Sequence, residues 1–233
     1  MLTGAIIFSR LASQRLPGKA LLDIDGRCLL GRVIDRSKLI KGIDRIIVAT
    51  SSEKEDDSIA LFSENEGVDI FRGSSEDVAG RALGACDEFK LKKFARICGD
   101  RPFFDPELVS NLIKIHNELN LDIATTTFPS SYPPGLSAEV VSTESLRHAI
   151  LLINSQNDRE HLTRYFYEHP SDFNIKNIEN ASPMNMEGLH LALDDTKDLE
   201  RARWIASHLN KDDSSSAGMA EIISLARTWE GLF

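Results

Sequence analysis

The sequence predicts an α/β protein with three layers, in which helices cover both faces of a mostly parallel sheet. Strand-like and helix-like segments alternate four times within roughly the first 120 residues, which is the usual pattern of a parallel sheet. The strand-like segments are short, continuous apolar runs, as in strands buried on both faces. The chain has 233 residues, which suits one domain, and we expect 1–233 to fold as a single unit.

The first half contains these elements in turn. Strands are expected at 4–8, 45–50, 68–71 and 94–98. Helices are expected at 29–40, 56–67, 73–89 and 105–119. Leu29, Val33 and Ile34 form an apolar stripe along the first helix. Gly67 is suited to the end of the second helix, and Pro106 to the first position of the fourth. Because parallel sheets bind ligands at the carboxyl ends of their strands, the loops after the first and fourth strands are candidate sites.

The second half is less regular. Two strand-like runs within 122–142 are separated by a Pro/Gly-rich stretch, and we interpret 125–180 as an arm within the domain. Thr143 is the expected N-cap of the helix that follows the second run. The remaining expected elements are helices at 142–153, 158–170, 194–209 and 217–233, a strand at 188–193 and a linker at 210–216.

The composition limits the classes of function. The chain carries 36 acidic against 27 basic residues, for a formal charge of -9, which argues against a general nucleic-acid binder. Cys28, Cys86 and Cys98 are odd in number and widely spaced, which favours reduced thiols in a cytoplasmic protein. No apolar run approaches the ~20 residues of a membrane span, and the sequence does not begin with a signal-peptide pattern. We therefore expect neither nucleic acid nor a membrane among its partners.

Positive charge gathers at the start of this acidic chain. The first 45 residues hold nine Lys and Arg against four Asp, and the loop after the first strand contains Arg10, Arg15 and Lys19. With the hydroxyl of Ser13 and backbone N–H groups near Gly18, these cations would cradle a polyphosphate. The alternative is a solvated basic loop, which three spaced cations alone would favour. Neither the Walker loop pattern nor the Rossmann glycine pattern occurs in the chain.

Acidic residues follow two of the apolar segments. Asp100 stands where the fourth strand ends, and a carboxylate facing a phosphate-binding loop is a natural ligand for Mg²⁺. Its alternative is a turn or cap aspartate. Asp194 and Asp195 follow the run at 188–193. They could supply a second metal carboxylate, or equally the N-cap and first-turn acids of the next helix.

A further charged group lies in the helix expected at 158–170. Arg159, His161 and Arg164, together with Glu160, could bind an anionic group. The alternative is that these side chains have only a structural role, because a lone histidine in such a helix more often supports the fold than takes part in catalysis.

Seven segments resemble, in the same order, the motifs of a known enzyme family. "SRLASQRLPGK" is similar to the opening motif "ARxxSxRLPGK" of CMP-sugar synthetases of the 3-deoxy-manno-octulosonate cytidylyltransferase type. The other six are "IVATSSEKEDD", "FRGSSEDVAGR", "RICGDRPFFDPELV", "YPPGLSAEVVS", "REHLTRYFYEH" and "LDDTKDLE". They resemble still more closely the cytidylyltransferases called spore coat polysaccharide biosynthesis protein F. The resemblance extends over 6–209.

The resemblance implies a fold and a reaction. The fold is that of GT-A-like nucleotide-diphospho-sugar transferases. The reaction is the transfer of CMP from CTP to a sugar or sugar acid with release of pyrophosphate, for surface polysaccharide synthesis, with Mg²⁺ as cofactor. Enzymes of this kind pair through the arm, so a homodimer is expected. Two other functions are possible interpretations of the sequence. One is a glycosyltransferase, which would be expected to carry a D-x-D motif, and this motif is absent after the fourth strand. The other is a non-catalytic nucleotide-binding relative.

The resemblance also implies roles for individual residues. The catalytic residues would be Arg15, Lys19 and Asp100. The nucleotide would be bound by these three and by Ser9, Arg10, Leu11, Ser13, Gly73, Ser74, Asp77 and Arg81. The metal ligands would be Asp100 and Asp195, with Asp194 as the alternative to the latter. The acceptor would be bound by Glu139, Arg159, Glu160 and His161.

Overall fold

The computed structural model describes residues 2–13, 15–153, 155–180, 186–209 and 215–232. The main sheet contains β1 (Leu2–Phe8), β4 (Arg45–Ser51), β5 (Asp69–Gly73), β6 (Leu91–Cys98), β7 (Ile123–Thr125), β8 (Glu139–Ser142) and β9 (Ile175–Asn177). A separate hairpin contains β2 (Asp23–Ile24) and β3 (Arg27–Cys28). The helices are α1 (Leu29–Ser37), α2 (Asp57–Asn65), α3 (Val78–Glu88), α4 (Pro106–Leu119), α5 (Thr143–Leu152), α6 (Gln156–Glu160), α7 (Arg164–Glu168), α8 (Thr196–His208) and α9 (Met219–Leu232). Among these described residues, no helix combines the length and apolarity needed to cross a bilayer.

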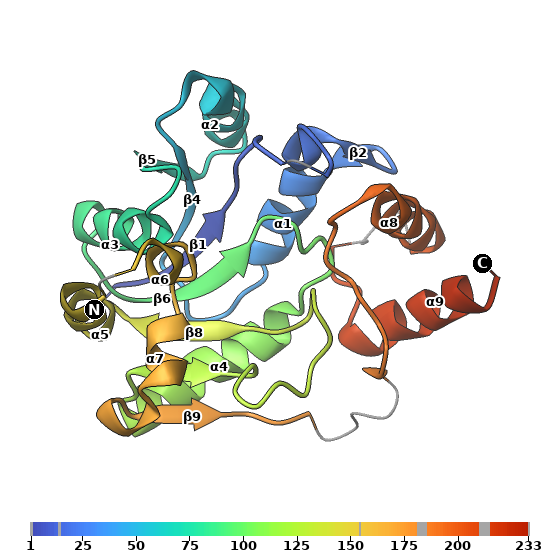
Figure 1. Cartoon of the computed structure of the whole chain (residues 1–233). Helices are drawn as coiled ribbons and strands as arrows, with labels where there is room; N and C mark the ends of the chain where they lie inside the picture. Colours follow the sequence, from blue (N-terminus) through green and yellow to red (C-terminus); the bar gives the residue numbers. More distant parts are fainter. Residues whose placement is uncertain (1, 14, 154, 181–185, 210–214, 233) are drawn as a thin grey trace.

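The main sheet has seven strands in the order β5-β4-β1-β6-β8-β7-β9. The four strands of the first half pair in parallel, as predicted. Strand β8 then enters antiparallel between β6 and β7, and β9 pairs in parallel with β7. Helices cover both faces of this sheet, and α8 and α9 lie together at one side (Figure 1). The predicted three-layer α/β class with a mostly parallel sheet is therefore confirmed.

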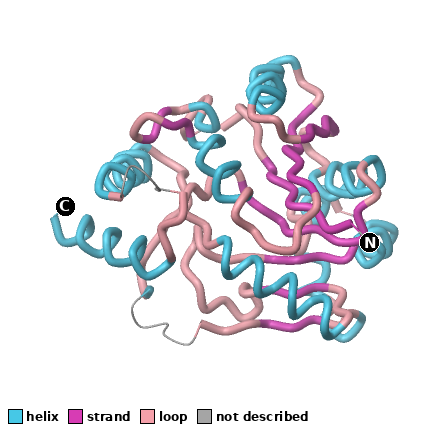
Figure 2. Tube along the Cα trace, turned by 180° about the vertical axis from the view of Figure 1, so that it is seen from behind, coloured by secondary structure: helices cyan, strands magenta, loops and turns pink. Residues whose placement is uncertain are grey.

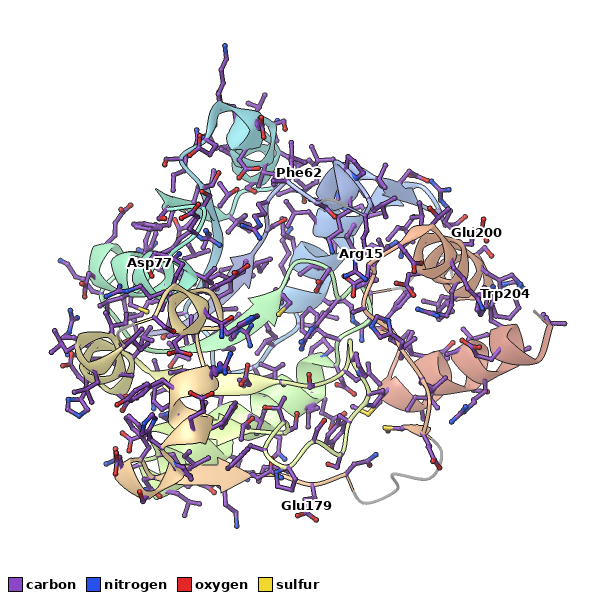
Figure 3. All side chains as sticks on the ribbon, in the orientation of Figure 1. Arg15, Phe62, Asp77, Glu179, Glu200 and Trp204 are labelled. Carbon is purple, nitrogen blue, oxygen red and sulfur yellow. The ribbon has the colours of Figure 1, made fainter. Side chains whose placement is uncertain are left out.

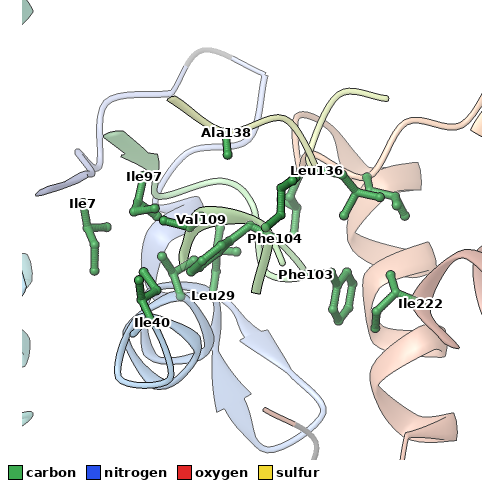
Figure 4. Packing of buried hydrophobic residues seen from close by; sticks show 14 of the residues in the cluster. Ile7, Leu29, Ile40, Ile97, Phe103, Phe104, Val109, Leu136, Ala138 and Ile222 are labelled. Carbon is green, nitrogen blue, oxygen red and sulfur yellow. The ribbon is translucent and has the colours of Figure 1, made fainter. Parts of the chain in front are cut away.

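Each face of the sheet has its own hydrophobic core. One core joins α1, α2 and α4 to the sheet and continues into α8 and α9. Figure 4 shows part of it, including Ile7 of β1, Leu29 of α1 and Ile222 of α9. The other core packs α3 and α5 on the opposite face, where alanines of α3 allow the helix to lie close to the strands. Figure 2 shows the molecule from behind, with helices outside the strands and the two termini on opposite sides.

The strand predicted at 188–193 is wrong. This segment lies outside the sheet and its backbone bonds instead to two loops. The N–H of Leu191 donates to the carbonyl of Pro134 at 2.7 Å, and that of Leu193 to the carbonyl of Asp100 at 2.8 Å. Gly135 makes the first contact possible, because a Cβ at this residue, which has a φ of +100°, would lie 2.3 Å from the Leu191 carbonyl carbon. The alternating leucines therefore reflect burial under loops rather than strand pairing.

The single helix predicted at 158–170 is also wrong. The structure divides it into α6 and α7, with a turn at 161–163. No residue of α6 is buried, whereas Leu162 and Phe166 are completely buried in the core beneath α5. The chain turns because Leu162 must enter this core while Glu160 and His161 stay at the edge of the sheet.

Smaller differences occur at the ends of elements. Ser142, not Thr143, is the N-cap of α5, because the Thr143 hydroxyl donates to the carbonyl of Leu91 at 2.9 Å. The short strands β2, β3 and β9 are absent from the prediction. Of the predicted linker at 210–216, residues 210–214 lie outside the described residues. The segment 125–180 contributes β8 and β9 to the main sheet, and its role as an arm between subunits stays a prediction.

Candidate active site

A cavity of about 1020 Å³ opens where β1 and β6 end. This is the edge of the sheet that the strand order predicts for ligand binding. Its walls come from the ends of both strands, the loop after β1, the start of α3, the turn after α6 and the chain before α8. The lining includes Phe8, Ser9, Arg10, Ser13, Arg15, Lys19, Arg81, Arg96, Cys98, Gly99, Asp100, Glu160, His161 and Asp194.

The loop after β1 is anchored through several of its backbone groups, although the side chain of Arg15 is 66% exposed. Gly99 donates to the carbonyl of Phe8 at 2.8 Å, which ties the ends of β6 and β1 together. Leu11 donates its N–H to the buried carboxylate of Asp56 at 2.7 Å. Gly18, with a φ of 70°, donates back to the carbonyl of Leu11 at 3.2 Å and closes the loop. These contacts direct the loop cations into the cavity.

Four charged side chains meet on one wall, and we call them the phosphate-side cluster: Arg15, Lys19, Asp100 and Asp194. The ammonium of Lys19 lies 3.5 Å from Asp100 Oδ2 and 3.4 Å from Asp194 Oδ1, and donates to the Leu193 carbonyl at 2.9 Å. A guanidinium nitrogen of Arg15 lies 3.1 Å from Asp194 Oδ1. Two of the three loop cations, Arg15 and Lys19, therefore share one wall with two carboxylates.

The acidic side chains of this wall differ in what their oxygens contact. Asp100 Oδ1 is buried and has no hydrogen-bond partner among the described residues. Asp194 turns toward the cavity, whereas Asp195 caps α8 in a capping box with Asp198. The N–H of Asp198 lowers the pKa of Asp195, as expected for a cap. The pair near Lys19 is thus Asp100 and Asp194.

A divalent cation fits this pair. Mg²⁺ takes oxygen ligands and commonly binds one or two protein carboxylates, with substrate phosphates and waters completing its shell. No group of three or more His, Cys, Asp or Glu side chains suited to a metal occurs in the part of the chain that the structure describes. The unpartnered Asp100 oxygen and the neighbouring Asp194 match the smaller protein contribution that Mg²⁺ needs in a phosphate site.

The opposite wall carries Arg10 and Arg81. Arg10 donates to the Ser75 carbonyl at 3.0 Å and lies 3.7 Å from Glu160. Arg81 is almost completely buried, and its Nε has no hydrogen-bond partner among the described residues. Burial, followed by the positive charge of Arg10, lowers the pKa of Arg81 to about 10. It remains a cation at neutral pH.

Some predicted site residues lie behind the cavity and support its walls. Leu11 contacts Asp56 through its backbone N–H. The Ser74 carbonyl accepts a hydrogen bond from Arg81 at 2.5 Å, and its hydroxyl accepts from the N–H of Asp77 at 3.0 Å. Gly73 ends β5 and accepts from Ser52 at 2.8 Å. Asp77 caps α3 and forms an ion pair with Arg159 at 2.9 Å. Figure 3 shows Arg15 on the side of α8 and Asp77 on the side of α3.

Glu139 also lies behind the cavity, in a group of side chains that we call the Arg96 network: Thr125, Thr127, Arg96, Glu139 and Tyr167. Arg96 donates to Glu139 Oε2 at 2.5 Å, and the Tyr167 hydroxyl bonds to Glu139 Oε1. Burial alone would raise the pKa of Glu139, but Arg96 and these hydrogen bonds outweigh it and hold the pKa below its ordinary value. Glu139 is therefore a buried carboxylate paired with a cavity-lining arginine.

Two residues that shape the cavity, Arg96 and Asp56, are not among the site residues predicted from the sequence. Arg96 is the one cation within the apolar run at 94–98, which is a usable signal, because an arginine flanked by buried residues needs a partner. Asp56 is less visible in sequence, since it is one of several acids in 53–57. Only the structure shows that it holds the loop after β1.

Comparison with known proteins places the chain among enzymes. The family model described as cytidylyltransferase matches residues 4–220. The spore coat polysaccharide biosynthesis protein SpsF of Bacillus subtilis is 30% identical over 226 residues, which cover 94% of this chain and 92% of that protein. An uncharacterised protein of Methanocaldococcus jannaschii is 34% identical over 205 residues, which cover 88% of this chain and 83% of that protein.

Two solved structures share the fold. A cytidylyltransferase from Leptospira borgpetersenii has a TM-score of 0.91 at 23% identity and covers 100% of this chain and 96% of its own. A CMP:2-keto-3-deoxy-manno-octonic acid synthetase, solved in complex with CTP, has a TM-score of 0.68 at 18% identity. It covers 90% of this chain and 100% of its own. At these identities the likeness shows a common fold.

Proposed function

The chain belongs to the cytidylyltransferase family, and from that premise we propose that it transfers CMP from CTP to a sugar or sugar acid in a Mg²⁺-dependent reaction. An oxygen of the acceptor hydroxyl forms a bond to the α-phosphorus of CTP. The bond from that phosphorus to the bridging oxygen breaks, pyrophosphate leaves, and the hydroxyl proton passes to solvent or a nearby base. The product is a CMP-activated sugar for glycan synthesis.

The observation that carries the proposal is the phosphate-side cluster at the end of β1 and β6. A triphosphate brings several negative charges that must be neutralised before an acceptor oxygen can approach the α-phosphorus. Arg10, Arg15 and Lys19 come from one loop and face a single cavity. Arginine forks match phosphate oxygens, and lysine adds a point charge. A glycosyltransferase would be expected to carry a D-x-D motif after β6, where the sequence is Gly99-Asp100-Arg101. The presence of Arg15, Lys19 and Asp100 together weighs against an inactive relative.

Lys19 has the most direct role in this proposal. Its ammonium lies between Asp100 and Asp194, so a cation already compensates the two carboxylates. When the nucleotide enters, Lys19 and Arg15 can exchange these carboxylates for phosphate oxygens, and they stabilise the negative charge that develops on the leaving pyrophosphate.

Asp100 and Asp194 would hold the Mg²⁺ ion. When bound, the ion supplies charge neutralisation of the phosphates and polarisation of the reacting oxygens. Asp194 takes the place that the resemblance gave to Asp195, because Asp195 is engaged as the cap of α8.

The experiment that tests the function measures pyrophosphate. The protein is incubated with each of the four ribonucleoside triphosphates, with Mg²⁺ or with a chelator, and with a panel of sugar acids, sugar phosphates and neutral sugars. We expect pyrophosphate with CTP, Mg²⁺ and at least one acceptor, and a CMP-sugar by mass spectrometry. Equal pyrophosphate release with all four nucleotides would contradict CTP as the specific donor. Undiminished pyrophosphate release in the presence of chelator would contradict the requirement for Mg²⁺.

A further inference from the structure

A second cavity adjoins the first. It has a volume of about 500 Å³ and is lined by Arg96, Phe128, His161, Thr163, Arg164, Tyr167 and Glu168. Arg96 and His161 line both cavities, so the two spaces meet at these side chains. The second cavity therefore borders the proposed nucleotide site without belonging to the loop that would bind phosphates.

The guanidinium at this junction is held in one orientation. Arg96 on β6 stands opposite Glu139 on β8 in the antiparallel register, and the side chains are 2.5 Å apart. The Glu139 side chain is 6% exposed, and the hydroxyls of Tyr167 and Thr127 lie against its other oxygen. Burial disfavours the charge of Arg96, but the neighbouring Cys98 and Glu139 outweigh it, so the pKa of Arg96 lies above its ordinary value. Arg96 stays charged and fixed.

Arg96 retains donors for a ligand. A guanidinium has five N–H donors in a rigid fork. Among the described residues its side chain has one hydrogen-bond partner, Glu139, and 23% of the side chain is exposed to the cavities. The acid on the cavity wall, Glu168, is already paired with Arg164 at 2.6 Å. The free edge of Arg96 is therefore suited to a carboxylate or a phosphate, which arginine binds through two parallel bonds.

The cavity also has an apolar surface. Phe128 stacks on Tyr167 with ring centroids 4.9 Å apart and an angle of 18° between the planes. Phe128 is 38% exposed, and both rings line the cavity. An aromatic face next to fixed polar groups suits a small, partly polar ligand such as a sugar ring.

We propose that Arg96 binds the anionic group of the acceptor, that the second cavity is the acceptor subsite, and that Glu139 is a positioning residue that acts through Arg96. The inference rests on the proposed function and narrows it to acceptors that carry a carboxylate or a phosphate. It also changes the implied acceptor set, because Arg159 is paired with Asp77 and Glu139 faces Arg96 rather than the open cavity.

The test separates acceptor binding from nucleotide binding. Calorimetry measures the binding of 3-deoxy-manno-octulosonate, mannose 1-phosphate and neutral mannose to the protein saturated with CTP, and steady-state assays give KM for each substrate. Arg96→Lys keeps a charge opposite Glu139, and the double variant Arg96→Gln/Glu139→Gln leaves no buried charge unpaired. Arg101→Lys is the matched control, because the Arg101 side chain donates hydrogen bonds to Ser137 and Arg101 lines neither cavity.

We expect an anionic probe to bind and neutral mannose not to bind. Arg96→Lys should weaken that binding, and raise the acceptor KM, by about tenfold or more, with KM for CTP and kcat nearly unchanged. The carboxylate and phosphate probes tell which anion is used. An unchanged acceptor affinity in Arg96→Lys, an equal loss of CTP affinity, or no binding of either anionic probe at millimolar concentration would overturn the inference. If an anionic probe binds through Arg96 but no pyrophosphate appears with any acceptor, the proposed function fails while the binding site stands.

Discussion

The phosphate-side cluster and the Arg96 network hold their charges in different ways. In the first, Lys19 lies 3.4–3.5 Å from two carboxylates, and the side chains of Asp100 and Asp194 are 29% and 25% exposed. In the second, Arg96 and Glu139 are 2.5 Å apart, and the carboxylate side chain is 6% exposed. The carboxylates of the cluster are partly exposed and loosely paired, whereas the carboxylate of the network is buried and tightly bonded. The two cations are shielded to a similar degree, since the side chain of Lys19 is 18% exposed and that of Arg96 is 23% exposed.

This difference indicates what each group can do. Partly exposed ion pairs contribute about 0–1 kcal/mol, so a ligand can replace their contacts at little cost. A buried pair cannot be separated cheaply, because each partner would be left as an uncompensated charge. The cluster is therefore suited to exchanging protein carboxylates for phosphates, whereas the network is suited to holding a guanidinium still.

The largest expected effect is on the stability of the network. Glu139→Ala leaves Arg96 without its partner and should lower the free energy of unfolding by about 3–5 kcal/mol. Urea denaturation followed by circular dichroism measures this. Glu144→Ala is the control, since Glu144 is 70% exposed and lies 3.7 Å from Arg147, and it should cost less than about 1 kcal/mol. Equal losses of unfolding free energy in the two variants would show that the Arg96–Glu139 pair contributes no more to stability than an exposed ion pair does.

The next largest effect is on turnover in the cluster. Asp100→Asn keeps the side-chain shape but removes the charge that faces Lys19 and that would bind the proposed Mg²⁺ ion. Pyrophosphate release should fall by roughly 10²–10³-fold, the usual loss when a group that stabilises transition-state charge is removed. Unfolding should change by less than about 1 kcal/mol. Asp69→Asn, which affects an exposed pair with Arg45, is the control. Near-normal turnover in Asp100→Asn would contradict the proposal that Asp100 is a ligand of Mg²⁺.

The two groups also differ in how far the sequence predicts them. Lys19 and Asp100 follow strands that pair in parallel, so their meeting at one sheet edge follows from strand order and from the motifs around them. Arg96 meets Glu139 only because β8 enters antiparallel beside β6, and no local pattern determines that register. The four parallel strands of the first half could be predicted because each one is a short apolar run that is visible in the local sequence. The position of Lys19 could be predicted because it lies in the loop that follows the first of these strands.

Errors in the prediction arise where burial depends on distant segments. The leucines at 189, 191 and 193 have the alternation of a strand, yet loops at Pro134 and Asp100 take up the backbone groups. The choice between Asp194 and Asp195 as the second metal ligand is a different case, and it stays a prediction. The capping box with Asp198 engages Asp195, whereas Asp194 faces Lys19. A sequence pattern cannot separate two adjacent acids whose roles differ by the direction of one turn.

The smallest expected effect is a change in how stability depends on pH. Tyr167→Phe removes a hydroxyl that bonds to Glu139 and helps to hold its pKa below the ordinary value of 4.5. A depressed carboxylate pKa contributes stability that is present above the unfolded-state pKa and is lost as the pH falls through the folded-state pKa. Raising the folded-state pKa toward 4.5 shrinks that contribution. The variant should therefore be less stable than the wild type by about 1 kcal/mol at neutral pH.

The same variant gives a distinctive pH profile. The difference between wild type and Tyr167→Phe should be constant above about pH 5 and should shrink below the ordinary Glu pKa, as the carboxylate becomes protonated in both proteins. Urea denaturation at a series of pH values measures it. Tyr165→Phe is the control, because the Tyr165 ring stacks on His169 and does not bond to Glu139. A difference that stays constant down to acid pH would mean that the Tyr167 hydroxyl contributes only hydrogen bonds that do not depend on the charge of Glu139, such as the one to Thr125. Tyr167 would then have no part in keeping Glu139 ionised.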